Sequence, residues 1–282
     1  MAARTGRNEN GAGDGPENGL ETFAQELRAQ REAAALTQEQ LAKLMGYSTS
    51  VIAKLETCRT IPSPQHADQA DEALQTPGTF GRLRKVAVNG VYEEWVRAYL
   101  DIEERATVLR WWEPLVVPGL LQTEAYARAM IRAGRPGDSD AEVEQLVMTR
   151  IARQQIWDRQ DPPPPMLFAV LAEGALRQCV GDAEVMREQL GRLLEAAASP
   201  RITIQVMPAS IGAHPGMLGP FVVASFESDP EAAYLDNALD GQVTERRKEV
   251  ARVGLLYDTL KCEALGPGAS AQLIARLAEE WT

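Results

Sequence analysis

The segment from Leu36 to Ile61, LTQEQLAKLMGYSTSVIAKLETCRTI, constrains the fold of this chain more than any other stretch. Thr37 and Gln40 have the spacing of a capping box, which predicts a helix beginning directly after Thr37. Gly46 follows that helix where a turn favours a positive φ. Ser48 is then the predicted N-cap of a second helix. The segment therefore indicates two short helices joined by a tight turn.

The two predicted helices each have an apolar side that can turn inward, formed by Leu41, Leu44, Met45, Val51, Ile52 and Leu55. The outward side of the second helix carries short, polar or basic residues, namely Thr49, Ser50, Ala53 and Lys54. Such side chains can contact base edges when a helix of this kind lies in the major groove of DNA. A generic pair of helices in an all-helical domain is the alternative that the pattern leaves open.

The spacing of small and apolar residues extends this pattern into both flanks. Ala42, Gly46 and Ile52 keep a fixed spacing, and helical segments are predicted on either side, at 27–38 and 61–74. Over this length the chain resembles the DNA-binding domain of phage-repressor-type (XRE-like) regulators. The resemblance implies a helix-turn-helix whose second helix reads DNA.

The resemblance also implies roles for individual residues. Phosphate contacts are expected from Gln38, Tyr47, Ser48 and Arg59. Base contacts are expected from Thr49, Ser50, Ala53 and Lys54. An internal ion pair between Arg31 and Glu56 would clamp the first helix of the domain to the third. Cys58 departs from the family pattern, which usually has glycine just past the recognition helix.

The negative net charge of the chain is unfavourable for binding DNA, which is itself negatively charged. The chain has a formal net charge of −11 over 282 residues. Between Glu21 and Lys85, eight basic residues balance eight acidic ones, so the excess of negative charge lies in the rest of the chain. Because phosphate neutralisation drives non-specific DNA binding, a neutral domain is expected to bind weakly as a monomer and to need two half-sites.

Composition places the chain among soluble globular proteins of about two domains. Residues 1–19 are polar and glycine-rich, which predicts a disordered tail rather than a secretory signal. No run of 18 apolar residues predicts a membrane helix. Cys58, Cys179 and Cys262 lie far apart, which argues for reduced thiols in the cytoplasm and against a metal site. No cofactor-binding motif is found.

A stretch with glycine, proline and basic residues at 76–90 marks the predicted boundary between a DNA-binding domain, 20–90, and a second domain, 91–282. Its cations Arg82, Arg84 and Lys85 suit either a solvated helix face or an additional phosphate clamp.

The second domain is predicted to combine helices with a small sheet of three or four strands. A long helix is expected at 91–113. Strands are expected at 166–172, 202–208, 220–227 and 233–236, and further helices at 123–134, 140–157, 173–178, 182–198, 244–263 and 270–281. The predicted fold class is therefore mainly α, and α+β overall, with a five-helix N-terminal domain followed by an α+β effector domain.

An ordered series of motifs supports a second resemblance. They are RATVLRWWEPLVVPGLLQTEAYARAMI, MTRIARQQ, EGALRQCVG, RITIQVMP and AHPGMLGPF. Together they resemble an effector domain of unknown function, number 5753, that follows repressor-type domains in many actinobacterial proteins. The resemblance implies an antitoxin-like regulator, often encoded beside a small partner protein.

Aromatic and apolar residues of this domain form the candidate site for a partner or ligand: Trp111, Trp112, Leu120, Leu121 and His214. Core packing is the alternative for the tryptophans. His214 is also a conceivable general base, but Ser210 and Ser225 stand in no nucleophile-elbow motif. No catalytic residue, and no enzyme activity, is therefore predicted.

The sequence favours a cytoplasmic, sequence-specific transcription regulator that binds a two-fold operator as a homodimer. Its second domain would dimerise and receive a small protein partner or a ligand. The first alternative is a protein-interaction module in which DNA binding is secondary. The weaker alternative is a hydrolase that uses His214.

Overall fold

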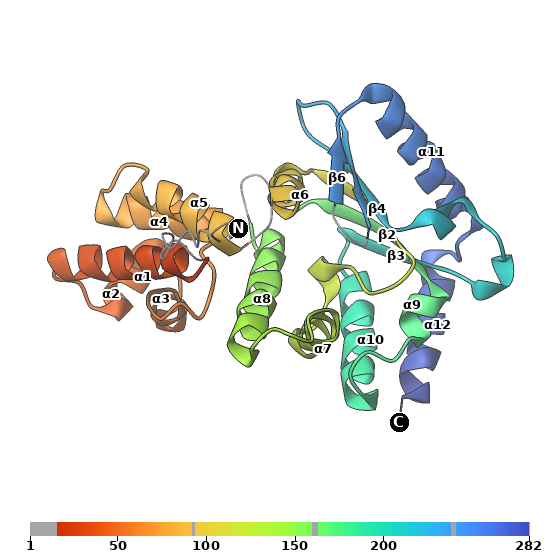
Figure 1. Ribbon diagram of the computed structural model, residues 1–282, viewed down its shortest axis with the longest axis horizontal. Helices are drawn as coiled ribbons and strands as arrows, with labels where there is room; N and C mark the ends of the chain where they lie inside the picture. The colour runs from red at the N-terminus through yellow and green to blue at the C-terminus, as the bar shows by residue number, and fades with distance from the viewer. Residues whose placement is uncertain (1–15, 92–93, 160–162, 238–240, 282) are drawn as a thin grey trace, which may run out of the picture. The chain divides into compact units, whose positions relative to one another are not determined.

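The computed structural model describes residues 16–91, 94–159, 163–237 and 241–281. The chain divides into two compact units, of which the first ends at Val91 and the second begins at Tyr92 (Figure 1).

The N-terminal unit is helical throughout its described residues, as expected. Its five helices are α1 (Pro16–Ala33), α2 (Gln38–Met45), α3 (Thr49–Glu56), α4 (Pro64–Leu74) and α5 (Thr79–Val91). α1 and α5 pack closely at Gly19, where an added Cβ would lie 2.8 Å from the carbonyl oxygen of Val86. The phenyl rings of Phe23 and Phe80 meet edge to face in the same core.

One expectation for this unit is corrected. α1 already begins at Pro16, so residues 16–19 are helical rather than part of a disordered tail, while residues 1–15 lie outside the described residues. The stretch 76–90, at the end of which the domain boundary was predicted, is largely α5, and the division of the chain follows it at Val91.

Local sequence signals fix the ends of α2. Thr37 and Gln40 exchange both bonds of a capping box, and Gly46 ends the helix with a φ of 74°. The predicted inward face is wrong at one position. α2 buries Leu41, Ala42 and Met45, whereas Leu44 is 57% exposed. Leu44 lies roughly 100° around the helix from the centre of the buried stripe.

The C-terminal unit is built on a mixed sheet of six strands among its described residues, in the order β3-β2-β1-β4-β5-β6. The strands are β1 (Val108–Glu113), β2 (Met166–Ala172), β3 (Ile202–Met207), β4 (Phe221–Ser225), β5 (Ala232–Asp236) and β6 (Gly241–Thr244). β1, β2 and β3 are parallel, and the pairs beyond β1 are antiparallel.

Helices cover both faces of this sheet. The α-helices are α6 (Glu94–Arg105), α7 (Glu124–Gly134), α8 (Asp140–Ala152), α9 (Glu173–Arg177), α10 (Ala183–Ala197), α11 (Arg247–Glu263) and α12 (Pro267–Glu280), and the 3-10 turns are η1 (Gly119–Leu121), η2 (Arg153–Trp157), η3 (Ala209–Ile211) and η4 (Pro215–Leu218). α10 and α12 contribute to the core on one face and α11 to the core on the other, as Figure 1 shows.

Two predictions for this unit are wrong in detail. The sheet has six strands rather than three or four, since β1 and β6 join the four strands that the sequence predicts. The helix predicted at 91–113 ends at Arg105, and the chain continues as β1. Trp111 and Trp112 explain the change, since adjacent residues of a strand can bury on opposite faces. The apolar stripe of a helix faces one side only, so a helix does not bury two adjacent residues on opposite faces.

Candidate nucleic-acid interface

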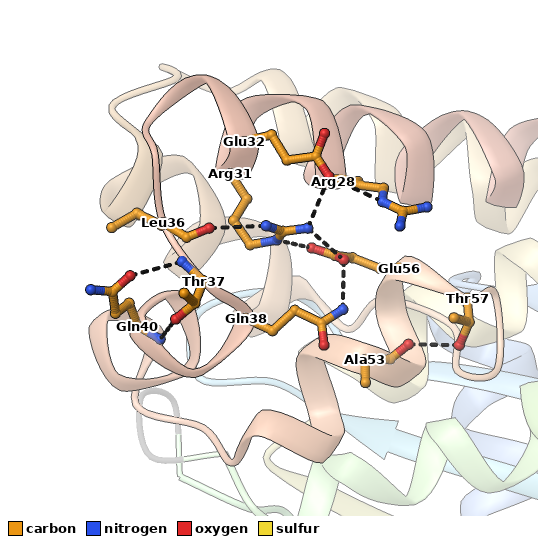
Figure 2. Close-up of polar contacts among 10 residues, drawn as sticks. All are labelled: Arg28, Arg31, Glu32, Leu36, Thr37, Gln38, Gln40, Ala53, Glu56 and Thr57. Carbon is orange, nitrogen blue, oxygen red and sulfur yellow. Dashed lines mark hydrogen bonds and ion pairs between the residues drawn. The ribbon is translucent and has the colours of Figure 1, made fainter.

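Glu56 joins three helices of the N-terminal unit. The guanidinium of Arg31 in α1 donates to both carboxylate oxygens of Glu56 in α3, with N–O distances of 2.5 and 3.1 Å. Gln38 of α2 donates to the same carboxylate at 2.8 Å. Arg31 also donates to the carbonyl of Leu36, in the turn between α1 and α2 (Figure 2). This shared carboxylate fixes the angle at which α3 is presented.

The ion pair is almost removed from water, with side-chain exposures of 10% for Arg31 and 2% for Glu56. Hydrogen bonding to Glu56 raises the pKa of Arg31, so the guanidinium stays charged. Arg28 and Glu32 form another ion pair on α1, in which both side chains are exposed to solvent.

The outward face of α3 is open to solvent. Thr49, Ser50 and Lys54 are exposed, while Ala53 is half-buried. The backbone carbonyl of Ala53 accepts a bond from the Thr57 hydroxyl at 2.6 Å. The inward residues Ile52 and Leu55 are fully buried. The helix therefore presents two hydroxyls and one ammonium group on a rigid surface.

The residues expected to bind phosphates differ in their availability. Ser48 is the N-cap of α3 but makes no side-chain cap bond, and it is exposed. Arg59 is also exposed. Gln38 is directed inward, because one amide hydrogen is bonded to Glu56, which leaves the other for a ligand. Lys43, which sequence reasoning did not single out, is exposed in the last turn of α2.

A buried histidine supports Tyr47. The rings of Tyr47 and His66 meet edge to face with centroids 4.7 Å apart. His66 Nδ1 accepts a bond from the backbone N–H of Ser63, within the capping box of α4. Burial, together with the charge of Arg84, lowers the pKa of His66 to about 4. A neutral imidazole is therefore part of the fold beneath Tyr47, which sequence analysis did not identify.

The turn after α3 has the bond pattern of a Schellman motif. The N–H of Arg59 donates to the carbonyl of Lys54 at 2.8 Å, and the N–H of Cys58 donates to that of Leu55 at 3.4 Å. Cys58 has a φ of 56°, in the left-handed region. The position at which the family usually has glycine thus retains the backbone conformation that favours glycine.

The cations of α5 are only partly free. Arg84 donates to the carbonyl of Pro62, and Arg82 donates to Thr79. Lys85 is exposed. Of these three cations, Lys85 is therefore the one whose side chain has no partner among the described residues.

The predicted partner site in the C-terminal unit is largely interior. Trp111, Leu120 and Leu121 belong to the core beneath α10 and α12, and Trp112 belongs to the core beneath α11. Their side chains are at most 7% exposed. These four residues therefore offer no surface anchor, and we do not retain that interpretation.

His214 supports the loop that precedes β4. Its Nδ1 accepts a bond from the N–H of Gly216, and its ring meets that of Trp112 at 5.2 Å. The indole N–H of Trp112 donates to the carbonyl of Gly216 at 2.8 Å. An added Cβ on Gly216 would lie 2.4 Å from the Trp112 ring. These contacts give His214 a structural role in loop 212–219.

Residues from several segments hold the loop at 119–122, which lies in the first motif of the second resemblance; Gln154 belongs to the second motif, whereas Trp157 and Gln189 lie outside the motifs. Gln154 donates to the carbonyls of Gly119 and Gln122, and the Trp157 indole donates to that of Leu120. Gln189 of α10 donates to the carbonyl of Leu121. Segments far apart in the sequence thus meet around 117–122, so these motifs describe architecture.

One further buried ionisable group was not identified from the sequence. Glu113, at the end of β1, is 6% exposed, and burial raises its pKa to about 7. Its carboxylate accepts a bond from the backbone N–H of Leu115.

Residues in the part of the chain that the structure describes form no cluster of three or more His, Cys, Asp or Glu suited to a metal. None of the helices described there is both long and apolar enough to cross a bilayer.

Comparison with known families agrees with this division of the chain. A family profile described as a helix-turn-helix domain matches residues 22–79, which span α2 and α3 and the elements that hold them. The protein is therefore of the class of helix-turn-helix DNA-binding regulators. A second profile, the domain of unknown function DUF5753, matches residues 96–276, more than half of the chain. The chain belongs to the DUF5753 family. Searches of curated proteins and of solved structures found no significant match.

Proposed function

We propose that this protein is a cytoplasmic, sequence-specific transcription regulator that binds a two-fold operator as a homodimer. The observation that carries the proposal is the exposed face of α3, with Thr49, Ser50 and Lys54, on a helix that the Glu56 carboxylate locks to α1 and α2. Such a helix can enter the major groove without losing its orientation.

We assign base contacts to Thr49, Ser50, Ala53 and Lys54. Phosphate contacts are assigned to Ser48, Tyr47, Arg59 and the remaining amide hydrogen of Gln38. The N-terminus of α3 supports the role of Ser48, because backbone N–H groups at a helix start favour an anion.

The C-terminal unit, in this proposal, holds two copies together and receives a small protein partner or a ligand. Partner binding changes DNA affinity only if it favours one arrangement of the two N-terminal units. The resemblance to antitoxin-like regulators favours a protein partner.

The base-reading face is tested with Lys54→Ala and Ser50→Ala. If each contacts a base, each variant should lose roughly 1–3 kcal/mol of binding to the operator, and much less to unrelated DNA. Binding isotherms on the two duplexes measure the difference, after the operator has been found by mapping bound genomic fragments.

Thr57→Val is the matched control, because Thr57 is exposed at the end of α3 and its hydroxyl is bonded to the backbone of the same helix. It should leave operator preference unchanged. Equal losses of affinity on both duplexes would indicate that Lys54 and Ser50 contact phosphates rather than bases. Unchanged operator binding would remove them from the interface.

A further inference from the structure

The N-terminal half of α11 carries three cations that the fold does not use. Arg247, Lys248 and Arg252 are exposed, and among the described residues none of them has an ion-pair or hydrogen-bond partner. Glu249, within the same segment, is held by Thr244 and Arg246. Glu245 is the other carboxylate of this segment.

Elsewhere in the described part of the C-terminal unit, Arg276 of α12 is the one other cation without a partner. The remaining arginines are engaged, for example Arg128 with two glutamates and Arg153 with Glu103. Lys261 lies over the ring of Phe168. Within the described part of the C-terminal unit, unpaired positive charge is therefore concentrated on α11, although the net charge of the chain is −11.

The position of these cations opposes the stability of α11. Positive charge near a helix N-terminus is unfavourable to the helix macrodipole. Lys248 and Arg252 are also four residues apart, where like charges repel. The first turns of α7, α8 and α10 contain acidic residues and no basic one, whereas the first turn of α11 contains Arg247 and Lys248 beside Glu249. Neither packing nor helix stability accounts for the three cations.

Four of the eight cations between Glu21 and Lys85, namely Lys43, Lys54, Arg59 and Lys85, have no side-chain hydrogen-bond or ion-pair partner among the described residues. The segment from Glu21 to Lys85 is neutral, and Arg31 is committed to Glu56. Arg28 is paired with Glu32, and Arg84 is bonded to a backbone carbonyl. Because cation–phosphate contacts supply most non-specific affinity, a chain with this N-terminal unit gains from cations placed elsewhere.

We propose that the α11 basic face, defined as Arg247, Lys248 and Arg252, binds the phosphate backbone of the DNA that flanks the operator. The inference rests on the proposed function and adds a second DNA contact in the DUF5753 unit. Arginine and lysine side chains both bind phosphate oxygens, and phosphate contacts by themselves carry no base preference. The contact therefore adds affinity for any duplex.

The test compares full-length protein with the triple variant Arg247→Gln/Lys248→Gln/Arg252→Gln. Binding to operator and to random duplex is measured over a range of salt concentrations. Each lost phosphate contact lowers the slope of log affinity against log salt by about 0.9, so three contacts correspond to about 2.7 per chain. Affinity for both duplexes should fall at least about tenfold near 0.1 M salt.

The matched control is Arg187→Gln/Arg192→Gln/Arg276→Gln, which removes the same charge from α10 and α12 on the other face of the sheet. It should leave the slope unchanged. The α11 variant should melt no lower than the wild type, because its cations oppose the helix dipole.

An unchanged slope in the α11 variant overturns the inference. An equal drop in the control overturns it as well, since net charge would then be the cause. These results are separable from failure of the proposed function, which would appear as a wild type without operator preference, or as a Lys54→Ala variant that keeps it.

Discussion

Arg31 is the residue on which the arrangement of α1, α2 and α3 most depends. Its guanidinium binds Glu56 and the Leu36 carbonyl, and its ion pair with Glu56 is nearly removed from water. Removing one partner of a buried pair leaves the other charge uncompensated, at a cost of about 3–5 kcal/mol. Arg31→Ala should therefore lower the melting temperature of the N-terminal unit. Calorimetry measures the change.

Arg28→Ala is the control, since the exposed Arg28–Glu32 pair is worth roughly 0–1 kcal/mol. If the two variants melted alike, the buried pair would not have the stabilising role assigned to it.

His66 gives the N-terminal unit a dependence on pH. Its folded pKa is about 4, against 6.5 for an unperturbed imidazole, so the unfolded chain binds more protons between these values. Stability is present above pH 6.5 and is lost as pH falls towards 4. The full shift corresponds to about 3 kcal/mol.

We predict that His66→Gln removes most of this loss, because glutamine at the same position can accept the Ser63 N–H bond, as Gln40 does for Thr37. Thermal melts at pH 7.5 and pH 5 compare the two proteins. A variant as acid-sensitive as the wild type would show that other groups cause the loss.

At the scale of elements, the turn after α3 stores a small strain. Cys58 adopts a φ of 56°, which costs a residue with a Cβ about 1–2 kcal/mol, although glycine loses about 0.5–1 kcal/mol in chain entropy. Cys58→Gly should therefore raise the free energy of unfolding by about 0.5–1 kcal/mol. Denaturant titration measures it.

Cys58→Ala separates the backbone from the thiol, since alanine keeps the Cβ and gains nothing from the left-handed φ. A stabilisation of equal size in both variants would instead point to the thiol, whose pKa burial raises.

The elements differ in how far sequence could predict them. The capping box at Thr37 and the glycine turn at Gly46 are local signals, and the structure has the helix that they predict. The helical spacing of apolar residues up to Ile102 extends to Leu109 and so predicts a helix where β1 lies, and only burial from both faces makes a strand of the residues around Trp111. β6 is a four-residue edge strand, too short for an alternating pattern.

The residues of the candidate site also differ in how far the sequence could predict their roles. The exposed face of α3 follows from helical periodicity, because residues three or four apart share a face. The Arg31–Glu56 pair spans 25 residues, and only the resemblance suggested it. The roles of His66 and His214 depend on ring contacts between distant segments, which no local pattern records. Burial of Trp112 likewise depends on α11, which lies more than a hundred residues later.

At the scale of the whole molecule, charge and size favour two copies on one operator. In the proposed function, an N-terminal unit whose segment 21–85 has no net charge contacts one half-site through few phosphates. Joining two such units makes the second contact intramolecular, which raises the overall affinity through effective concentration. We therefore expect the full chain to sediment as a dimer at micromolar concentration.

A dimer of fixed geometry binds two half-sites only when both lie on the same side of the duplex, so its affinity should depend on the spacing between them. Half-sites bound by two recognition helices lie about 34–36 Å apart, one turn of the duplex. Inserting about 5 bp between them places the half-sites on opposite sides of the duplex and should abolish the gain from two-site binding. Inserting about 10 bp restores the phase and should recover part of the affinity. Gel-shift titration on the three duplexes, with the same half-sites in each, measures this relation. Affinity independent of the insert length, together with a monomeric full chain, would contradict dimeric binding and leave one half-site as the operator.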